Sequence, residues 1–269
     1  MDLASALLLG LVQGLTEFLP ISSSGHLVLA QHFLGWTEPQ VLFDVCLHIG
    51  TFAAVLAVFW RDILGMIGGG LSLLAAPGKV FRQHSLTVDQ KTCLLVVLGT
   101  VPIVALGLFA RDFIEGLFAS TTAVCVNLLV TGTFLWLTRY APKGALVPRT
   151  TSYGLVLLVG LAQSIALAPG ISRSGSTISA ALMLGLDRDW AARLSFLLFT
   201  PAVMGALLLE LLKIKTFDMA LTPVIAGTLM AAVSGYLALI WLVKLVRKGS
   251  FFKFAPYCWL AGLLGLIFI

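Results

Sequence analysis

The stretch QGLTEFLPISSSGH, from Gln13 to His26, returns 150 residues later as QSIALAPGISRSGS, from Gln163 to Ser176. Both copies lie in strongly apolar sequence, yet both are rich in polar side chains and in the helix-breaking residues proline and glycine. An ungapped alignment pairs identical residues at Gly10 and Gly160, Leu11 and Leu161, Gln13 and Gln163, Ile21 and Ile171, Ser22 and Ser172, Ser24 and Ser174, and Gly25 and Gly175. The chain therefore contains an internal repeat.

The two copies differ at residues that could carry chemistry. Glu17 and His26 occur only in the first copy, and Arg173 occurs only in the second. An ionisable side chain within an apolar segment is costly, and such residues usually face a binding site or another charge. These three residues are therefore the first candidates for a functional site.

The composition predicts an integral membrane protein. Hydrophobic residues make up 59% of the chain and charged residues 11%, against about 25% charged residues in a typical soluble domain. The apolar runs are long and do not alternate with polar residues, which favours an α-helical bundle. The net charge of +5 comes from basic residues scattered over short loops, a pattern that reflects membrane topology, so we expect no nucleic-acid partner.

Apolar runs long enough to cross a membrane, which needs about 20 residues, predict six transmembrane helices. We place them at Val41–Trp60, Cys93–Ala110, Gly116–Leu137, Trp190–Leu212, Leu221–Val246 and Phe254–Ile269, with the longest loop at residues 61–92. Four shorter apolar pieces flank the two polar stretches, at Leu3–Leu19, His26–Leu34, Tyr153–Ala168 and Ser174–Leu186. Each polar stretch thus joins two half-length helices, which predicts two re-entrant helix-turn-helix hairpins.

We expect one membrane domain over residues 1–269, built from a first repeat at 1–140 and a second at 151–269. Each repeat has one hairpin and three spans. An odd number of spans inverts the second copy relative to the first, so the sequence predicts an inverted-topology repeat whose hairpin tips meet near the bilayer midplane.

Positive charges predict the orientation. In this topology the face that holds both termini carries 3 Lys and Arg residues, Arg111, Lys213 and Lys215, whereas the other face carries 13. Because cytoplasmic loops are enriched in Lys and Arg, both termini should lie outside the cytoplasm. The first hairpin then enters from the outer face, and the site opens to that side.

The two tips together predict an anion site. The serines of each tip can cap the helix that follows, and its free N–H groups point into the same space. The convergence of so many donors with an arginine favours a phosphate ligand. The candidate substrate-binding residues are Gln13, Ser22, Ser24, Gly25, Ser172, Ser174, Gly175, Ser176 and Thr177.

A carboxylate at Glu17 would repel a phosphate. Either a divalent cation bridges Glu17 and phosphate oxygens, which we favour, or a proton is shared with His26. Glu17 could instead form a structural ion pair with Arg173. The serines could be only helix caps, and Gln13 and Gln163 could only satisfy backbone groups.

Four further polar residues lie outside the two stretches. We expect Asp44 to be a helix-start residue, with contact to a metal as the alternative. We expect His32, His48 and His84 to be structural.

The two stretches resemble the motifs of a known family. The pattern Q-x-x-x-E followed by FLPISSSGH, with PGISRSGST in the second half, closely resembles the undecaprenyl-diphosphatases, bacterial membrane phosphatases also called bacitracin resistance proteins. The length, the order of helices and the repeat agree as well, so the resemblance covers essentially the whole chain. The opening position of the first motif is Glu or Gln in this family. Here it is Gln13, so one possible metal-binding carboxylate is absent.

The resemblance implies hydrolysis of undecaprenyl diphosphate to undecaprenyl phosphate in the plasma membrane, assisted by Mg²⁺ or Ca²⁺. By motif position, Glu17, His26 and Arg173 are the essential residues, and Ser23 and Thr177 lie beside the phosphates. Arg173 would clamp the diphosphate. Either His26 is the nucleophile or it activates Ser23, which we favour.

A transporter of lipid phosphates is the alternative, because inverted repeats with broken helices also build transporters. Such a protein would bind the same head group, but it would not need a nucleophile or a base. The other partners we expect are membrane lipids, and a homodimer is left open.

Overall fold

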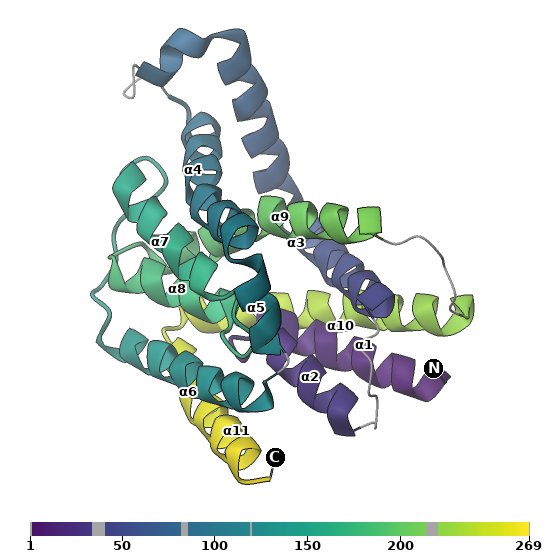
Figure 1. The fold of residues 1–269 in the computed structure, drawn as a ribbon. Helices are drawn as coiled ribbons and strands as arrows, with labels where there is room; N and C mark the ends of the chain where they lie inside the picture. Colours follow the sequence, from purple (N-terminus) through teal and green to yellow (C-terminus); the bar gives the residue numbers. More distant parts are fainter. Residues whose placement is uncertain (1, 34–40, 82–85, 119, 214–219, 269) are drawn as a thin grey trace.

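The computed structural model describes residues 2–33, 41–81, 86–118, 120–213 and 220–268 (Figure 1). In these ranges the chain forms α-helices, short 3-10 turns and one isolated β-bridge between Leu146 and Leu186, with no strand. The helices are α1 (Leu3–Phe18), α2 (Ser23–Phe33), α3 (Val41–Ala75), α4 (Val88–Phe109), α5 (Arg111–Phe118), α6 (Thr121–Leu137), α7 (Tyr153–Ile165), α8 (Arg173–Met183), α9 (Arg188–Lys213), α10 (Leu221–Arg247) and α11 (Ala255–Phe268).

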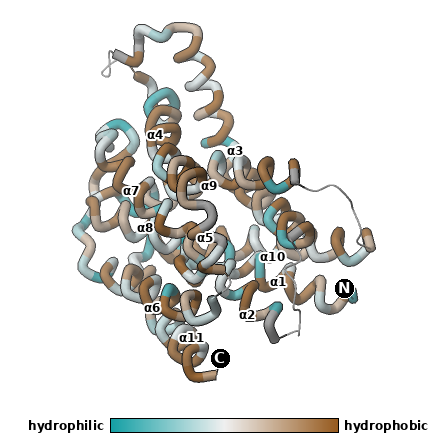
Figure 2. Tube along the Cα trace, in the orientation of Figure 1, coloured by the Kyte–Doolittle hydropathy of each residue, from teal (hydrophilic) through white to brown (hydrophobic). Residues whose placement is uncertain are grey.

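Six helices of the described chain are long and apolar enough to cross a membrane. They are α3, α4, α6 with the 3-10 turn after it, α9, α10, and α11 with the 3-10 turn before it. Figure 2 shows apolar residues over most of their length. The prediction of an all-α integral membrane protein with six spans is confirmed.

The prediction of a loop over residues 61–92 is wrong at both ends, because α3 continues to Ala75 and α4 already begins at Val88. Phe59 has a non-helical backbone (φ −108°, ψ 19°), so the helix bends one residue before the predicted end of the span. Beyond the bend, α3 packs against the start of α4: a Cβ at Gly69 would lie 2.6 Å from the carbonyl carbon of Asp89. Gln90 Nε2 also donates to Ser72 Oγ at 2.8 Å. These contacts support a helix where glycines suggested a loop.

The third predicted span also begins later than expected. Residues Arg111–Phe118 form the separate short helix α5, and α6 starts at Thr121. Ser120 is the N-cap of α6, since its hydroxyl accepts from the N–H of Ala123 at 3.2 Å.

Two pairs of short helices, α1 with α2 and α7 with α8, carry the polar stretches. Each pair packs on a long helix from the other half of the chain, α1 on α10 and α7 on α4. A Cβ at Gly10 would overlap the carbonyl oxygen of Gly227, and a Cβ at Gly160 would overlap that of Gly99. Gly10 and Gly160 are equivalent in the repeat, so the same close approach is made twice with the halves exchanged.

The turn after each first helix is held by the last span of the opposite half. In the second turn, Asn127 of α6 donates to the carbonyl of Pro169 at 2.7 Å, and Thr131 donates to that of Gly170 at 2.9 Å. In the first turn, the thiol of Cys258 on α11 donates to the carbonyl of Pro20 at 3.5 Å. The two turns are thus fixed by α6 and α11.

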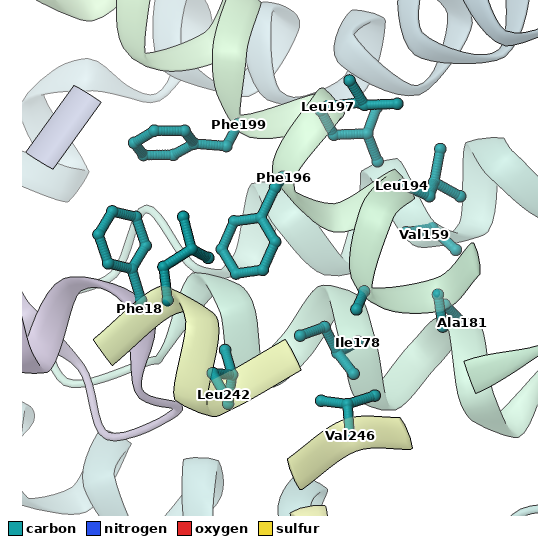
Figure 3. Packing of buried hydrophobic residues seen from close by; sticks show 14 of the residues in the cluster. Phe18, Val159, Ile178, Ala181, Leu194, Phe196, Leu197, Phe199, Leu242 and Val246 are labelled. Carbon is teal, nitrogen blue, oxygen red and sulfur yellow. The ribbon is translucent and has the colours of Figure 1, made fainter. Parts of the chain in front are cut away.

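An apolar core includes Phe18, at the end of α1, and residues of α9 (Figure 3). The ring of Phe18 meets the edges of Phe196 and Phe199 on α9, with centroids 5.8 and 6.2 Å apart. All three rings are at most 1% exposed. Since Phe18 follows Glu17 in the chain, this packing fixes the backbone that presents the carboxylate.

Candidate functional site

An ion pair joins the two turns. Arg173, the first residue of α8, donates from Nη2 to Oε1 of Glu17, near the end of α1, at 2.6 Å. A second bond supports it, because the hydroxyl of Ser174 donates to the carbonyl of Phe18 at 2.8 Å. The turn glycines also meet the opposite turn: a Cβ at Gly25 would lie 3.3 Å from Cα of Gly170. The structure thus brings the two sequence motifs into one site.

The second oxygen of the Glu17 carboxylate holds the Ser23 hydroxyl. Ser23 Oγ donates to Glu17 Oε2 at 2.6 Å, and Gln13 Nε2 donates to the same oxygen at 3.0 Å. The short distance is typical of a hydroxyl bonded to a carboxylate. Glu17 is only 7% exposed, so it sits where a proton acceptor is shielded from water.

His26 makes different contacts from those we expected. Its Nδ1 lies 2.8 Å from the carbonyl oxygen of Ser22, and its Nε2 lies 2.7 Å from the hydroxyl of Tyr257 on α11. The Ser23 hydroxyl is bonded to Glu17 and not to the imidazole. In this geometry Glu17 accepts the hydrogen bond of Ser23, and His26 lies three residues further along on the same face of α2.

The Arg173 guanidinium is held from two sides. The central carbon Cζ lies 3.7 Å from the ring centroid of Phe199, and Nη2 donates to Glu17. The Arg173 side chain is 16% exposed. A guanidinium has five N–H donors, and the bond to Glu17 uses one of them. The remaining donors give Arg173 the means to bind a second anion.

The expectation that serines cap the half-helices holds for the equivalent pair Ser22 and Ser172. Ser22 Oγ accepts from the N–H of Gly25 at 3.4 Å, and Ser172 Oγ accepts from that of Gly175 at 3.1 Å. Ser24 lies 3.3 Å from Ser22, hydroxyl to hydroxyl. Ser22 has a positive φ of 70°. A non-glycine residue in this region costs about 1–3 kcal/mol and is typical of functional sites.

The remaining predicted substrate-binding residues are on α8, where Ser176 and Thr177 are buried. Thr177 is fully buried, with its hydroxyl 2.6 Å from that of Ser195 and donating to the carbonyl of Arg173 at 2.8 Å. Ser176 is 4% exposed, and its hydroxyl has no hydrogen-bond partner within the described chain. Gly175 faces the first turn, with a Cβ position 3.4 Å from Cβ of Pro20. Thr177 therefore supports the backbone of Arg173.

His48 is a residue of the site that the sequence analysis assigned to structure alone. Its Nε2 lies 3.8 Å from Glu17 Oε2, and its Nδ1 donates to the carbonyl of Asp44 at 2.8 Å. It stands on α3, outside both motifs. Asp44 lies in the first turn of α3, where its carboxylate accepts from Gln31 at 2.9 Å, in agreement with a helix-start residue. The side chain of His32 and the whole of His84 lie outside the described residues.

The donor set near Glu17 fits a hard divalent cation that also binds the substrate. Among the described residues there is no cluster of three or more His, Cys, Asp or Glu side chains. However, Oε1 of Gln13 is buried without a hydrogen-bond partner in that part of the chain, beside the Glu17 carboxylate that its Nε2 binds. Amide and carboxylate oxygens are the ligands that Mg²⁺ and Ca²⁺ prefer, and Mg²⁺ commonly takes its other ligands from phosphates and water.

Comparison with known proteins gives a consistent result. Residues 6–264 match the family model described as bacitracin resistance protein BacA. A curated relative from Desulfatibacillum aliphaticivorans, named undecaprenyl-diphosphatase, is 48% identical over 261 residues, which cover 95% of this chain and 94% of the relative. A second relative of the same name, from Desulforapulum autotrophicum, is 44% identical over 277 residues, which cover 99% of this chain and 98% of that relative. The chain therefore belongs to the bacitracin resistance protein BacA family.

Proposed function

We propose that this protein is a membrane phosphatase that hydrolyses undecaprenyl diphosphate to undecaprenyl phosphate and inorganic phosphate. The observation that carries the chemistry is the hydroxyl of Ser23, bonded at 2.6 Å to a buried carboxylate that also binds Arg173. A hydroxyl needs an adjacent proton acceptor to become a nucleophile, and Glu17 supplies one. The substrate itself is inferred from the name of the curated relatives.

In the first step, Ser23 Oγ attacks the terminal phosphorus of the diphosphate. The bond from that phosphorus to the bridging oxygen breaks, and undecaprenyl phosphate leaves with the bonding electron pair. Glu17 takes the proton of the hydroxyl, which it already contacts. The product on the protein is a phosphoserine.

Arg173 and the start of α2 stabilise the charge that develops on the transferred phosphoryl group. The free N–H donors of the guanidinium reach the phosphoryl oxygens, while Phe199 and Glu17 hold its plane. Donors fixed before the reaction are the largest source of such stabilisation. Ser23 is the first residue of α2, so the positive end of the helix dipole lies at the reacting oxygen.

In the second step, water attacks the phosphoserine and releases inorganic phosphate. His26 Nε2 accepts the proton of the water and passes it to the departing phosphate, and protonated Glu17 returns its proton to Ser23 Oγ. His26 suits this part because its Nδ1 donates to Ser22, which leaves Nε2 unprotonated; the water takes the place of the Tyr257 hydroxyl at this nitrogen. Both residues end in their starting state.

A divalent cation, Mg²⁺ or Ca²⁺, would be held by Glu17 and by the amide oxygen of Gln13. When bound, it supplies charge neutralisation between the carboxylate and the diphosphate. The Glu17–Arg173 pair has zero net charge. Without the cation, this pair offers no net positive charge to balance an incoming diphosphate.

We further propose that α1 with α2 and α7 with α8 are re-entrant hairpins in an inverted repeat, residues 1–140 and 151–269. The exchanged packing of Gly10 on Gly227 and of Gly160 on Gly99 supports this topology. The 3-to-13 division of Lys and Arg supports a plasma-membrane orientation with both termini and the site on the outer side. Contacts with membrane lipids and a homodimer stay predictions.

Phosphate release by the purified protein in detergent micelles tests the function, because a micelle has no two sides between which a lipid could be moved. We expect inorganic phosphate to appear in proportion to enzyme. Binding of the lipid without release would favour the transporter, an activity to which the names of the curated relatives give no support.

A further inference from the structure

The imidazole of His26 is held by the last helix of the chain. Tyr257 on α11 places its hydroxyl 2.7 Å from His26 Nε2. The two rings are also stacked, with centroids 5.7 Å apart and planes inclined by 11°. These residues are 231 positions apart, so the contact depends entirely on how α11 packs against the first turn.

The contacts of the ring define which of its two nitrogens carries the proton. A carbonyl oxygen can only accept, so the ring nitrogen facing the Ser22 carbonyl, Nδ1, carries the proton. In the neutral imidazole the other nitrogen, Nε2, then has a lone pair, and it accepts from the Tyr257 hydroxyl. Both nitrogens are thereby assigned, and the ring cannot flip without losing both bonds.

We propose that Tyr257 is a positioning residue for His26, which fixes the orientation of the ring and keeps Nε2 unprotonated by donating to it. The kinetic part of this inference rests on the proposed function, whereas the contact itself does not. No sequence motif marks Tyr257, since it lies in an apolar span outside both polar stretches.

The repeat supports a specific role for this contact. In the second half, the residue equivalent to His26 is Ser176, and α6 holds the turn there through Asn127 and Thr131, which bind backbone groups. In the first half, Cys258 on α11 makes the corresponding backbone contact. Tyr257 adds a bond to a side chain that only the first half possesses.

Tyr257→Phe isolates the hydroxyl, because it keeps the stacked ring. The matched control is Tyr236→Phe on α10, since Tyr236 is 41% exposed and Tyr257 is 46% exposed. We expect Tyr257→Phe to lower kcat about 2- to 10-fold, the effect of one neutral hydrogen bond, with KM unchanged. The control should keep kcat and KM at the values of the unsubstituted protein.

The nitrogen signals of the imidazole give a readout that a merely structural role would not move. In protein labelled with ¹⁵N-histidine, His26 is assigned as the signals missing from His26→Gln. The measurement is made at a pH of about 8.5, above the ordinary imidazole pKa of about 6.5. There the unsubstituted protein should show a protonated Nδ1 and a hydrogen-bonded, unprotonated Nε2. Tyr257→Phe should shift the Nε2 signal to that of an unbonded nitrogen, while the signals of His48 stay in place.

Three results would overturn the proposal: a proton on Nε2 in the unsubstituted protein, identical His26 signals in Tyr257→Phe, or a kcat equal to that of Tyr236→Phe. The first needs no Tyr257 variant and therefore does not depend on how Tyr257→Phe folds. If the unsubstituted protein releases no phosphate at all, the proposed function fails, yet the nitrogen signals still decide whether Tyr257 holds His26.

Discussion

Replacing Glu17 by glutamine tests the proton acceptor while nearly preserving its shape. The carboxylate accepts from Ser23 and Gln13 on one oxygen and from Arg173 on the other. The introduced amide can accept on one side only, and it cannot take a proton from Ser23. A positioned proton acceptor contributes about 10²- to 10⁴-fold to the rate. At about 1.36 kcal/mol per tenfold, kcat should fall by the equivalent of roughly 3–5 kcal/mol.

The same change removes the counter-charge of Arg173, whose side chain is 16% exposed. Breaking a buried ion pair from one side costs about 3–5 kcal/mol of stability, and the partial exposure here and the contact with Phe199 reduce that figure. Activity must therefore be measured per folded protein, by phosphate release from monodisperse protein in detergent. The control is Asp62→Asn, which breaks the ion pair between Asp62 and Arg193 away from the turns and should leave kcat unchanged.

This assay distinguishes a Glu17–Arg173 pair that is only structural from one in which Glu17 is the proton acceptor. If the pair is only structural, folded Glu17→Gln protein keeps most of its activity and loses only thermal stability. The smallest expected loss of kcat is about 100-fold. A kcat above about one tenth of the original value would therefore refute Glu17 as the proton acceptor.

Three other predictions concern the site and the orientation of the protein in the membrane. Arg173→Lys keeps the charge but loses the planar fork over Phe199, so kcat should fall about 10²- to 10³-fold, the effect of one lost transition-state donor; near-normal turnover would show that a point charge suffices. Chelators should abolish activity and Mg²⁺ or Ca²⁺ should restore it, and Gln13→Glu should lower the metal concentration needed because it adds a second carboxylate; full activity in chelator would contradict the metal site. Cysteines introduced at Glu38 and Lys215 should react with an impermeant reagent on intact cells, and cysteines at Val80 and Ala145 should not; the reverse pattern would overturn the orientation.

Much of the fold could be predicted because apolar length and helix breakers are local properties. The six spans and the breaks at Pro20 and Pro169 follow from residues a few positions apart. The continuation of α3 to Ala75 could not be predicted in this way. It depends on packing of Gly69 against the backbone of Asp89, which lies 20 residues further along the chain.

The site was predicted where its residues lie in the repeated motifs, and missed where they do not. Glu17 and Arg173 stood out as charges in apolar sequence, and the structure places them 2.6 Å apart. His48 is also an ionisable residue within an apolar span, so the same reasoning could have found it without any motif. Tyr257 carried no such signal, because an aromatic residue in a transmembrane helix is ordinary.

The partner of the Ser23 hydroxyl also could not be predicted. The sequence places His26 three residues after Ser23, a spacing that favours contact on a helix. The contacts of the imidazole with Ser22 and Tyr257 instead leave Ser23 to Glu17. Which of two polar groups a hydroxyl binds is decided by tertiary packing, here the approach of α11.

Identification of the phosphorylated residue tests the central claim, that Ser23 makes the attack, most directly. Protein quenched during turnover with substrate labelled in the terminal phosphate can be digested and analysed by mass spectrometry. We expect an acid-stable phosphate on Ser23, more of it in His26→Ala because the second step is slowed, and none in Ser23→Ala, which should be inactive. An acid-labile phosphate on His26, or substantial turnover by Ser23→Ala, would contradict the account.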